Sequence, residues 1–157
     1  MKINQTVRHF EHTADVKIAI VMSQYNDSLG SVLRENVVST LLKHHVQEKN
    51  IKTFLVPGAL EIPYLTKKLI QHPTKFDAII TLGLVIKGDT YHFELVCNES
   101  YRALMDLNLA SPIPIIFGIL TVNNIDQAKN RVEATGLNKG EEFALSALEM
   151  ITINHKL

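Results

Sequence analysis

Short apolar runs rich in β-branched residues alternate along this chain with longer segments of helical period, and this alternation restricts the fold most strongly. The apolar runs predict strands at residues 17–22, 51–56, 76–82 and 114–120. The intervening and following segments predict helices at residues 28–47, 59–71, 92–109, 125–134 and 139–153. Strands that alternate with helices are typical of a parallel sheet covered by helices on both faces. The sequence therefore predicts an α/β fold, a three-layer α/β/α sandwich.

Length and charge narrow the class of protein. The 157 residues suit one domain. The 16 Lys and Arg equal the 16 Asp and Glu, so no basic footprint predicts nucleic acid or an anionic membrane as a partner. Cys97 is the single cysteine, which excludes an intramolecular disulfide and favours a small core residue in a reducing compartment. Because we find no apolar signal core and no run near the roughly 20 residues that span a bilayer, we expect a cytoplasmic protein.

Residues 83–94 (GLVIKGDTYHFE) combine several features of an active site. They follow a predicted buried strand, and Gly88 permits a tight turn or a close backbone approach. Asp89 and Thr90 are residue types that cap a helix, and a phosphate could bind at such a helix start. His92 follows, and an imidazole can move protons near neutral pH. Plain capping and an ordinary surface histidine explain the same residues, so on composition alone both interpretations stay open.

Two further polar segments also follow predicted strands, at residues 23–28 (SQYNDS) and 56–63 (VPGALEIP). Ligands of open α/β sheets bind at the carboxyl edge of the strands, where these segments should meet. Tyr25 offers a flat face on which a heterocycle could stack. Glu61, one turn into the following helix, either accepts hydrogen bonds from a polyol or simply favours the helix dipole.

Two cations in the carboxyl-terminal third are less easily interpreted. Arg131 lies late in a predicted helix, where the helix dipole alone would explain it. Lys139 lies where the last helix should begin, so it is either solvated or held for an anionic ligand. A conventional dinucleotide-binding site is excluded because no G-x-G-x-x-G motif follows the first strand.

From about residue 17 to its end the chain resembles the lumazine synthases, through the ordered segments SQYND, VPGALEIP, GLVIKGDTYHFE, FGILT followed by QAKNR, and NKGEEFALSALEM. The resemblance implies a flavodoxin-like fold with a central four-stranded parallel sheet, in a domain of residues 17–157. It also implies the penultimate step of riboflavin biosynthesis. In that step 5-amino-6-(D-ribitylamino)uracil and 3,4-dihydroxy-2-butanone 4-phosphate condense to 6,7-dimethyl-8-ribityllumazine, with release of phosphate and water and with neither a metal nor a redox cofactor.

The resemblance also implies roles for individual residues. Tyr25 stands where the family usually has a Phe that stacks on the pyrimidine, Glu61 accepts from the ribityl hydroxyls, and His92 transfers protons. The other positions implied to hold the pyrimidine or its ribityl chain are Asn26, Gly58, Ala59, Leu60, Val85, Ile86, Lys87 (where the family often has Arg) and Phe117. Those implied to hold the phosphate are Gly88, Asp89, Thr90, Arg131 and Lys139. Asp89 would repel a phosphate unless its carboxylate points away.

Family members form their sites between subunits. Phe117, Arg131 and Lys139 match positions that reach the site from an adjacent subunit, so the resemblance implies at least a homopentamer. Many members assemble twelve pentamers into an icosahedral shell, and riboflavin synthase is a further candidate partner. Residues 132–137 (VEATGL) lack the glycine-bounded kink of shell formers, which favours a free pentamer. Residues 1–16 are expected to form an amino-terminal arm, either disordered or paired with a neighbouring subunit.

Two functions of other classes stay open. A flavin- or lumazine-binding protein without turnover would bind ligand tightly and release no phosphate, and the presence of His92, Thr90, Arg131 and Lys139 argues against it. A structural or carrier assembly would give no reason for the GDTYHFE loop, although it could coexist with catalysis.

Overall fold

A computed structural model describes residue 10 and residues 12–157 of the chain. Its centre is a parallel sheet with the strand order β2-β1-β3-β4. The strands are β1 (Ile18–Ser23), β2 (Ile51–Val56), β3 (Ala78–Ile86) and β4 (Ile115–Val122). The α/β fold class and the parallel four-stranded sheet predicted from the sequence are thus confirmed.

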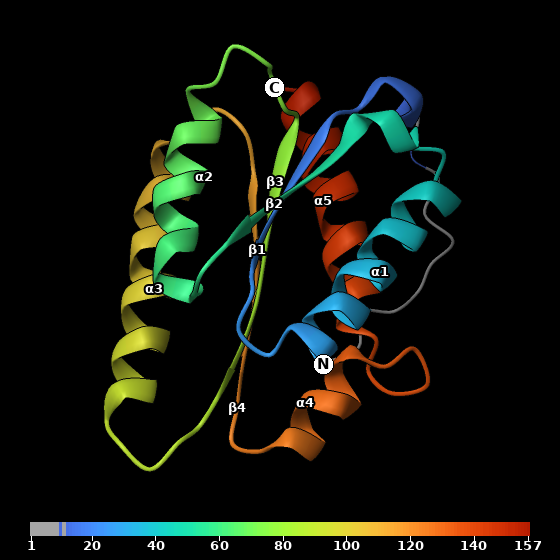
Figure 1. Cartoon of the computed structure of the whole chain (residues 1–157). Helices are drawn as coiled ribbons and strands as arrows, with labels where there is room; N and C mark the ends of the chain where they lie inside the picture. Colours follow the sequence, from blue (N-terminus) through green and yellow to red (C-terminus); the bar gives the residue numbers. More distant parts are fainter. Residues whose placement is uncertain (1–9, 11) are drawn as a thin grey trace.

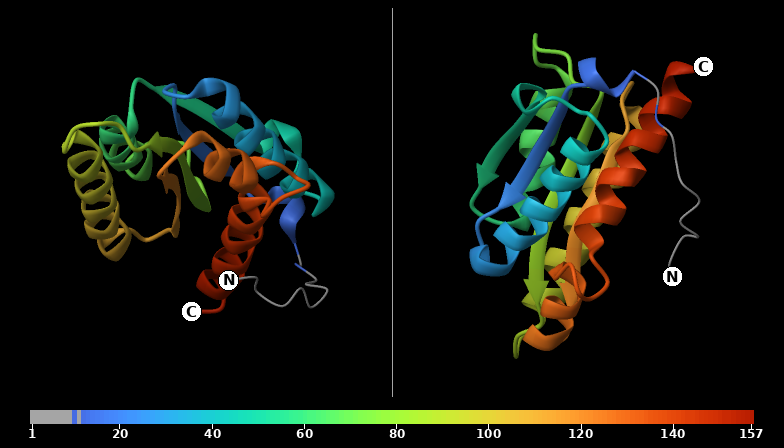
Figure 2. Two further views of the ribbon diagram at one scale, coloured as in Figure 1. Left: turned by 90° about the horizontal axis from the view of Figure 1, so that it is seen from below. Right: turned by 90° about the vertical axis from the view of Figure 1, so that its right-hand side faces the viewer.

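Helices cover both faces of this sheet (Figure 1). One layer holds α1 (Asp27–Lys43), α4 (Ile125–Val132) and α5 (Lys139–His155), and the other holds α2 (Ile62–Ile70) and α3 (His92–Ala110). The three layers are also visible in the turned views of Figure 2. Alternate residues of β1 point into two separate apolar clusters, one under each helical layer, as the pleat of a strand requires. No helix within the described residues is long and apolar enough to cross a membrane.

The strands β3 and β4 run further toward the carboxyl edge than the sequence predicts. β3 continues past the predicted end at Leu82 to Ile86, and β4 continues to Val122. The two extensions pair with each other, because residues 83–86 are in register with residues 119–122. Gly83 is therefore part of a strand, and the polar loop begins only at Lys87.

Helix boundaries also differ from the predicted ones. The first helix ends at Lys43, because His45 has a φ of 68° and the Val46 amide turns back to bond the Leu41 carbonyl. The predicted helix 59–71 is split into a one-turn 3-10 helix at Ala59–Glu61 and α2, which begins with a proline in its first turn. α4 ends at Val132, and α5 continues to His155.

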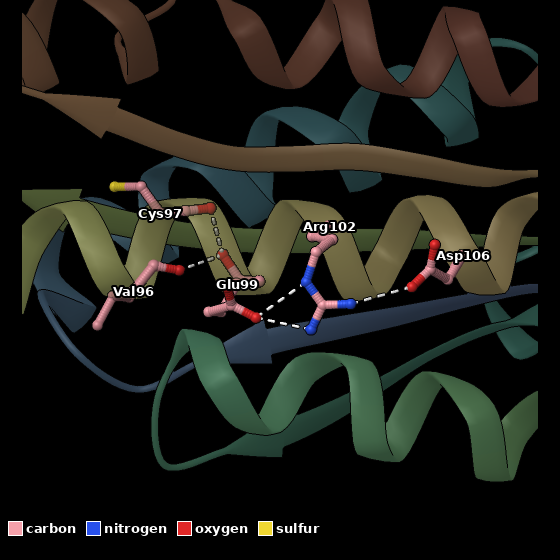
Figure 3. Close-up of polar contacts among 6 residues, drawn as sticks. Val96, Cys97, Glu99, Arg102 and Asp106 are labelled. Atoms are coloured by element: carbon pink, nitrogen blue, oxygen red, sulfur yellow. Dashed lines mark hydrogen bonds and ion pairs between the residues drawn. The ribbon is translucent and has the colours of Figure 1, made fainter.

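The outer surface of α3 carries both charged and apolar side chains. Figure 3 shows Arg102 bridging Glu99 and Asp106, at 2.6 and 3.2 Å. Large apolar side chains of the same helix and its N-cap are nevertheless exposed: Tyr91, Leu95, Met105 and Leu109.

Cys97, also on α3, is half-buried, so the interpretation as a core residue is wrong. Partial burial, followed by the nearby Glu94 carboxylate, raises the pKa of its thiol. A raised pKa lowers the thiolate fraction near neutral pH, so Cys97 is a poor candidate for a nucleophile.

Most of the predicted amino-terminal arm, residues 1–9 and 11, lies outside the described residues. The part that is described lies against its own chain. The Thr13 hydroxyl donates to the His44 carbonyl at 2.6 Å, and the rings of Phe10 and His44 meet edge to face with centroids 5.4 Å apart. Pairing of the arm with a neighbouring subunit stays a prediction.

Candidate active site

A cleft of about 450 Å³ lies where the loops after β1, β2 and β3 meet at the carboxyl edge of the sheet. The chain crosses from β1 to β2 on one side and from β3 to β4 on the other, so β1 and β3 flank the switch point at which such sheets bind ligands. Most of the predicted site residues line this cleft: Tyr25, Asn26, Gly58, Ala59, Leu60, Glu61, Val85, Ile86, Gly88, Thr90 and His92. Lys87 and Asp89 belong to the same loop but do not line it.

Another hollow, of about 320 Å³, lies between the α3–β4 connection and the end of α5. Its lining residues include no ionisable side chain. It therefore offers nothing for proton transfer, and the cleft at the carboxyl edge is the stronger candidate for an active site.

Gly58 allows an aromatic ring and a carboxylate to approach each other at one wall of the cleft. A Cβ at this position would lie 2.9 Å from Glu61 Oε2 and 3.7 Å from Tyr25 Cδ2. Since Gly58 has an extended φ of −144°, the glycine is required for space rather than for a special backbone angle. Glu61 lies at the N-cap of α2, not inside it, and its side chain makes no capping bond. Its exposed carboxylate is therefore free to accept hydrogen bonds from a ligand.

Asn26 links the loop after β1 to the end of β3. Its backbone is left-handed, with a φ of 58°, a conformation that Asn tolerates better than most residues. Its side-chain amide donates to the Leu84 carbonyl at 2.8 Å, so it makes no cap for α1 although it occupies the N-cap position. Asn26 thus shapes the cleft between β1 and β3.

The loop that joins β3 to α3 is held at its two ends. The Lys87 amide donates to the Val122 carbonyl at 2.8 Å, and the Lys87 ammonium lies 3.3 Å from the Glu94 carboxylate in the first turn of α3. Between these anchors Gly88 has no positive φ, and a Cβ there would meet no atom within 4 Å. The glycine leaves open space beside the loop.

The start of α3 presents free hydrogen-bond donors to this space. The helix begins at His92 with Tyr91 as N-cap and without a side-chain cap, so the capping interpretation of Asp89 and Thr90 is wrong. Within the described residues, the amides of Asp89 and Thr90 donate to no backbone carbonyl. Free amides at a helix start favour an anion, and His92 lies at the same place and lines the cleft.

The three residues expected from an adjacent subunit do not reach this cleft. Phe117 lies on β4, and its ring meets the Tyr101 ring edge to face at 5.7 Å. Arg131 lies on α4 and donates to the Gln127 carbonyl of its own helix at 3.0 Å. Lys139 begins α5, and the ammonium of its partly exposed side chain lies 2.6 Å from Glu142 Oε2, so its charge is paired within its own chain. α4 and α5 lie across the sheet from α3 (Figure 1).

The structure also adds cleft residues that the sequence analysis missed: Ser23, Leu84, Phe93 and Val96. Val96 lies four residues after His92 on α3, so helical spacing could have found it, whereas Phe93, the next residue after His92, gave no such signal. Leu84 was hidden by the early predicted end of β3. Ser23 ends β1 at the edge of the sheet where ligands bind, and this position could have identified it as a site residue.

Comparison with protein families gives an independent result. A family model described as 6,7-dimethyl-8-ribityllumazine synthase matches residues 15–155 of the 157-residue chain. The matched range contains all the strands and every residue that lines the cleft.

Proposed function

The chain belongs to the 6,7-dimethyl-8-ribityllumazine synthase family, transferases of riboflavin biosynthesis, and from this premise we propose that it performs the family's condensation itself. Its substrates would be 5-amino-6-(D-ribitylamino)uracil and 3,4-dihydroxy-2-butanone 4-phosphate. The observation that carries the proposal is that Tyr25, Glu61 and His92, from loops after three different strands, line one cleft. A stacking face, a polyol acceptor and a proton-transfer group are what these substrates require.

Each wall of the cleft suits one part of the substrates. The pyrimidine ring stacks on Tyr25, and its ribityl hydroxyls donate to the Glu61 carboxylate. The phosphate of the second substrate accepts from the free loop amides and the Thr90 hydroxyl at the start of α3. Asp89 is exposed and does not line the cleft, so its carboxylate can point away from that phosphate.

His92 supplies proton transfer between the two bound substrates. The pyrimidine 5-amino group attacks the ketone carbon, and the imidazole takes the amine proton and returns it to the departing water. Elimination of phosphate and closure of the second ring, with loss of another water, again move protons beside the same side chain. Much of the rate would come from holding the two substrates together, since proximity is worth more than one general acid or base.

We propose further that a second copy of the chain completes each site, in a free homopentamer. Arg131 and Lys139, the expected counter-charges for the phosphate, lie away from the cleft of their own chain. Exposed apolar side chains on α3, such as Leu95 and Leu109, are of the kind that assembly covers. Sedimentation of the purified protein tests the assembly: a pentamer supports it, an icosahedral shell corrects its size, and an active monomer refutes it.

The function itself is tested by mixing purified protein with both substrates and following lumazine absorbance and released phosphate together. Equal amounts of the two products, formed well above the uncatalysed background, would establish the synthase. Tight binding of the pyrimidine with product at background level would instead indicate a binding protein that shares the fold.

A further inference from the structure

Ser23, the last residue of β1, is a buried polar side chain without a hydrogen-bond partner of its own. It is 2% exposed, yet it lines the cleft. Its hydroxyl takes part in no hydrogen bond within the part of the chain that the structure describes. Its oxygen is not sealed from solvent as the unpaired hydroxyl of Thr66 is, so it is open to the cleft and available to hydrogen-bond a ligand.

The surroundings of Ser23 keep its hydroxyl at the floor of the cleft. On the neighbouring strand β3, Gly83 has no side chain, and a Cβ there would lie 3.2 Å from Ser23 Oγ and 3.4 Å from Ile119 Cγ2. The glycine thus leaves a notch that the hydroxyl enters beside an apolar side chain. Protein atoms close the site on these sides, and the cleft is the side from which a ligand can reach it.

The other polar side chains of the cleft already have a hydrogen-bond partner or a proposed role in the reaction. Asn26 bonds the Leu84 carbonyl. In the proposed function Glu61 serves the ribityl chain, Thr90 the phosphate and His92 the protons. The aromatic face of Tyr25 and the side chains of Val85 and Ile86 contact a ring without reading its polar edge. Recognition of that edge by a side chain is left to Ser23.

We propose that the Ser23 hydroxyl hydrogen-bonds the edge of the heterocyclic ring of the pyrimidine substrate and so selects for it. The inference rests on the proposed function, whose reaction it leaves unchanged. A pyrimidinedione edge carries carbonyl acceptors and N–H donors, and a hydroxyl can pair with either. A buried group that must be paired rejects rings lacking the complementary atom more strongly than an apolar pocket can.

This role predicts opposite effects on stability and on binding. A hydroxyl retained for the fold would stabilise the chain without ligand, and its removal would lower the melting temperature. A hydroxyl retained for a ligand has no protein partner to lose in the free protein, so Ser23→Ala should leave the melting temperature equal or higher. The same variant should bind the pyrimidine less tightly, with a Kd about three- to tenfold higher.

The experiment is an anaerobic calorimetric titration of 5-amino-6-(D-ribitylamino)uracil into wild type, Ser23→Ala and Ser23→Cys, with melting of each protein alone. Both variants should show the weaker Kd, an equal or higher melting temperature, and an unchanged KM for the butanone phosphate. The cysteine variant keeps the space filled but offers only a weak hydrogen-bonding thiol, so it keeps the test decisive if the alanine variant folds poorly.

Thr66→Val is the matched control. Thr66 is fully buried on α2, and its hydroxyl lacks a partner among the described residues, but it does not line the cleft. The control should keep its stability and the wild-type Kd. Wild-type affinity in both Ser23 variants, or a lower melting temperature that accounts for their loss of binding, would overturn the inference. Wild-type protein that binds no pyrimidine would overturn the proposed function instead, and the inference with it.

Discussion

Two groups of residues implied by the same family resemblance end up in different parts of this molecule. The cleft group, Tyr25, Glu61 and His92, comes from the loops after β1, β2 and β3, and all of it lines one cleft. The remote group, Phe117, Arg131 and Lys139, comes from β4, α4 and α5 and lines none of that cleft. Parallel strands deliver their following loops to one edge, so the topology of a single chain assembles the first group. The same topology leaves the second group away from that cleft, and our proposal is that these residues act at the cleft of another chain.

His92→Ala should have the largest effect, because it removes the proposed proton-transfer group from the cleft. We expect kcat to fall by about a hundred- to ten-thousand-fold, the usual worth of a general acid or base. Pyrimidine binding, measured by titration, should be almost unchanged. His72→Ala, which alters an exposed histidine on the α2–β3 connection, is the control and should keep wild-type kcat. Unchanged turnover in His92→Ala would remove His92 from the mechanism.

Mixing two impaired variants tests whether the remote group acts on another chain. His92→Ala and Arg131→Ala proteins are unfolded together in equal amounts, refolded, and assayed at low phosphate substrate. If each site takes His92 from one chain and Arg131 from its neighbour, about a quarter of the sites in random mixtures carry both residues. Activity should then rise toward a quarter of wild type. If both residues serve the same chain, every site keeps one defect and no activity returns.

Arg131→Ala should have an intermediate effect that is confined to one substrate. Loss of a charge-assisted hydrogen bond should raise the KM for the butanone phosphate about tenfold to a hundredfold, and leave the Kd for the pyrimidine unchanged. Lys129→Ala is the control, because Lys129 is an exposed cation in the last turn of the same helix. An equal rise in KM in both variants would indicate general electrostatic attraction rather than a specific contact of Arg131.

The sequence predicted those parts of the fold that depend on local patterns of apolar and polar residues. β2 was predicted with its observed bounds, Ile51–Val56, and the strand–helix alternation gave the parallel sheet. The end of β3 was misplaced because a glycine usually interrupts a strand pattern, whereas Gly83 is held in the sheet by pairing with β4. Such pairing depends on a strand more than thirty residues away. The spacing of apolar residues around Gly83 therefore does not reveal it.

The same limit applies to the candidate site. Tyr25, Glu61 and His92 were identifiable because each stands in a polar segment directly after a strand. Ser23 was missed because its importance lies in what surrounds it, namely burial and the notch left by Gly83. The partner of Lys139 was missed as well, although Glu142 stands three positions later, where helical spacing predicts an ion pair.

The smallest expected effect belongs to Tyr25→Phe, which restores the residue usual in the family. Tyr25 is 73% exposed and lines the cleft, so its hydroxyl can remain in water while its ring stacks on the pyrimidine. Removing the hydroxyl should therefore change kcat/KM by less than about twofold. Tyr25→Ala, measured beside it, should weaken pyrimidine binding by about two- to tenfold because the stacking face is lost. If Tyr25→Phe instead costs as much as Tyr25→Ala, the hydroxyl itself contacts the substrate, and the cleft group recognises it by hydrogen bonding at this position rather than by stacking.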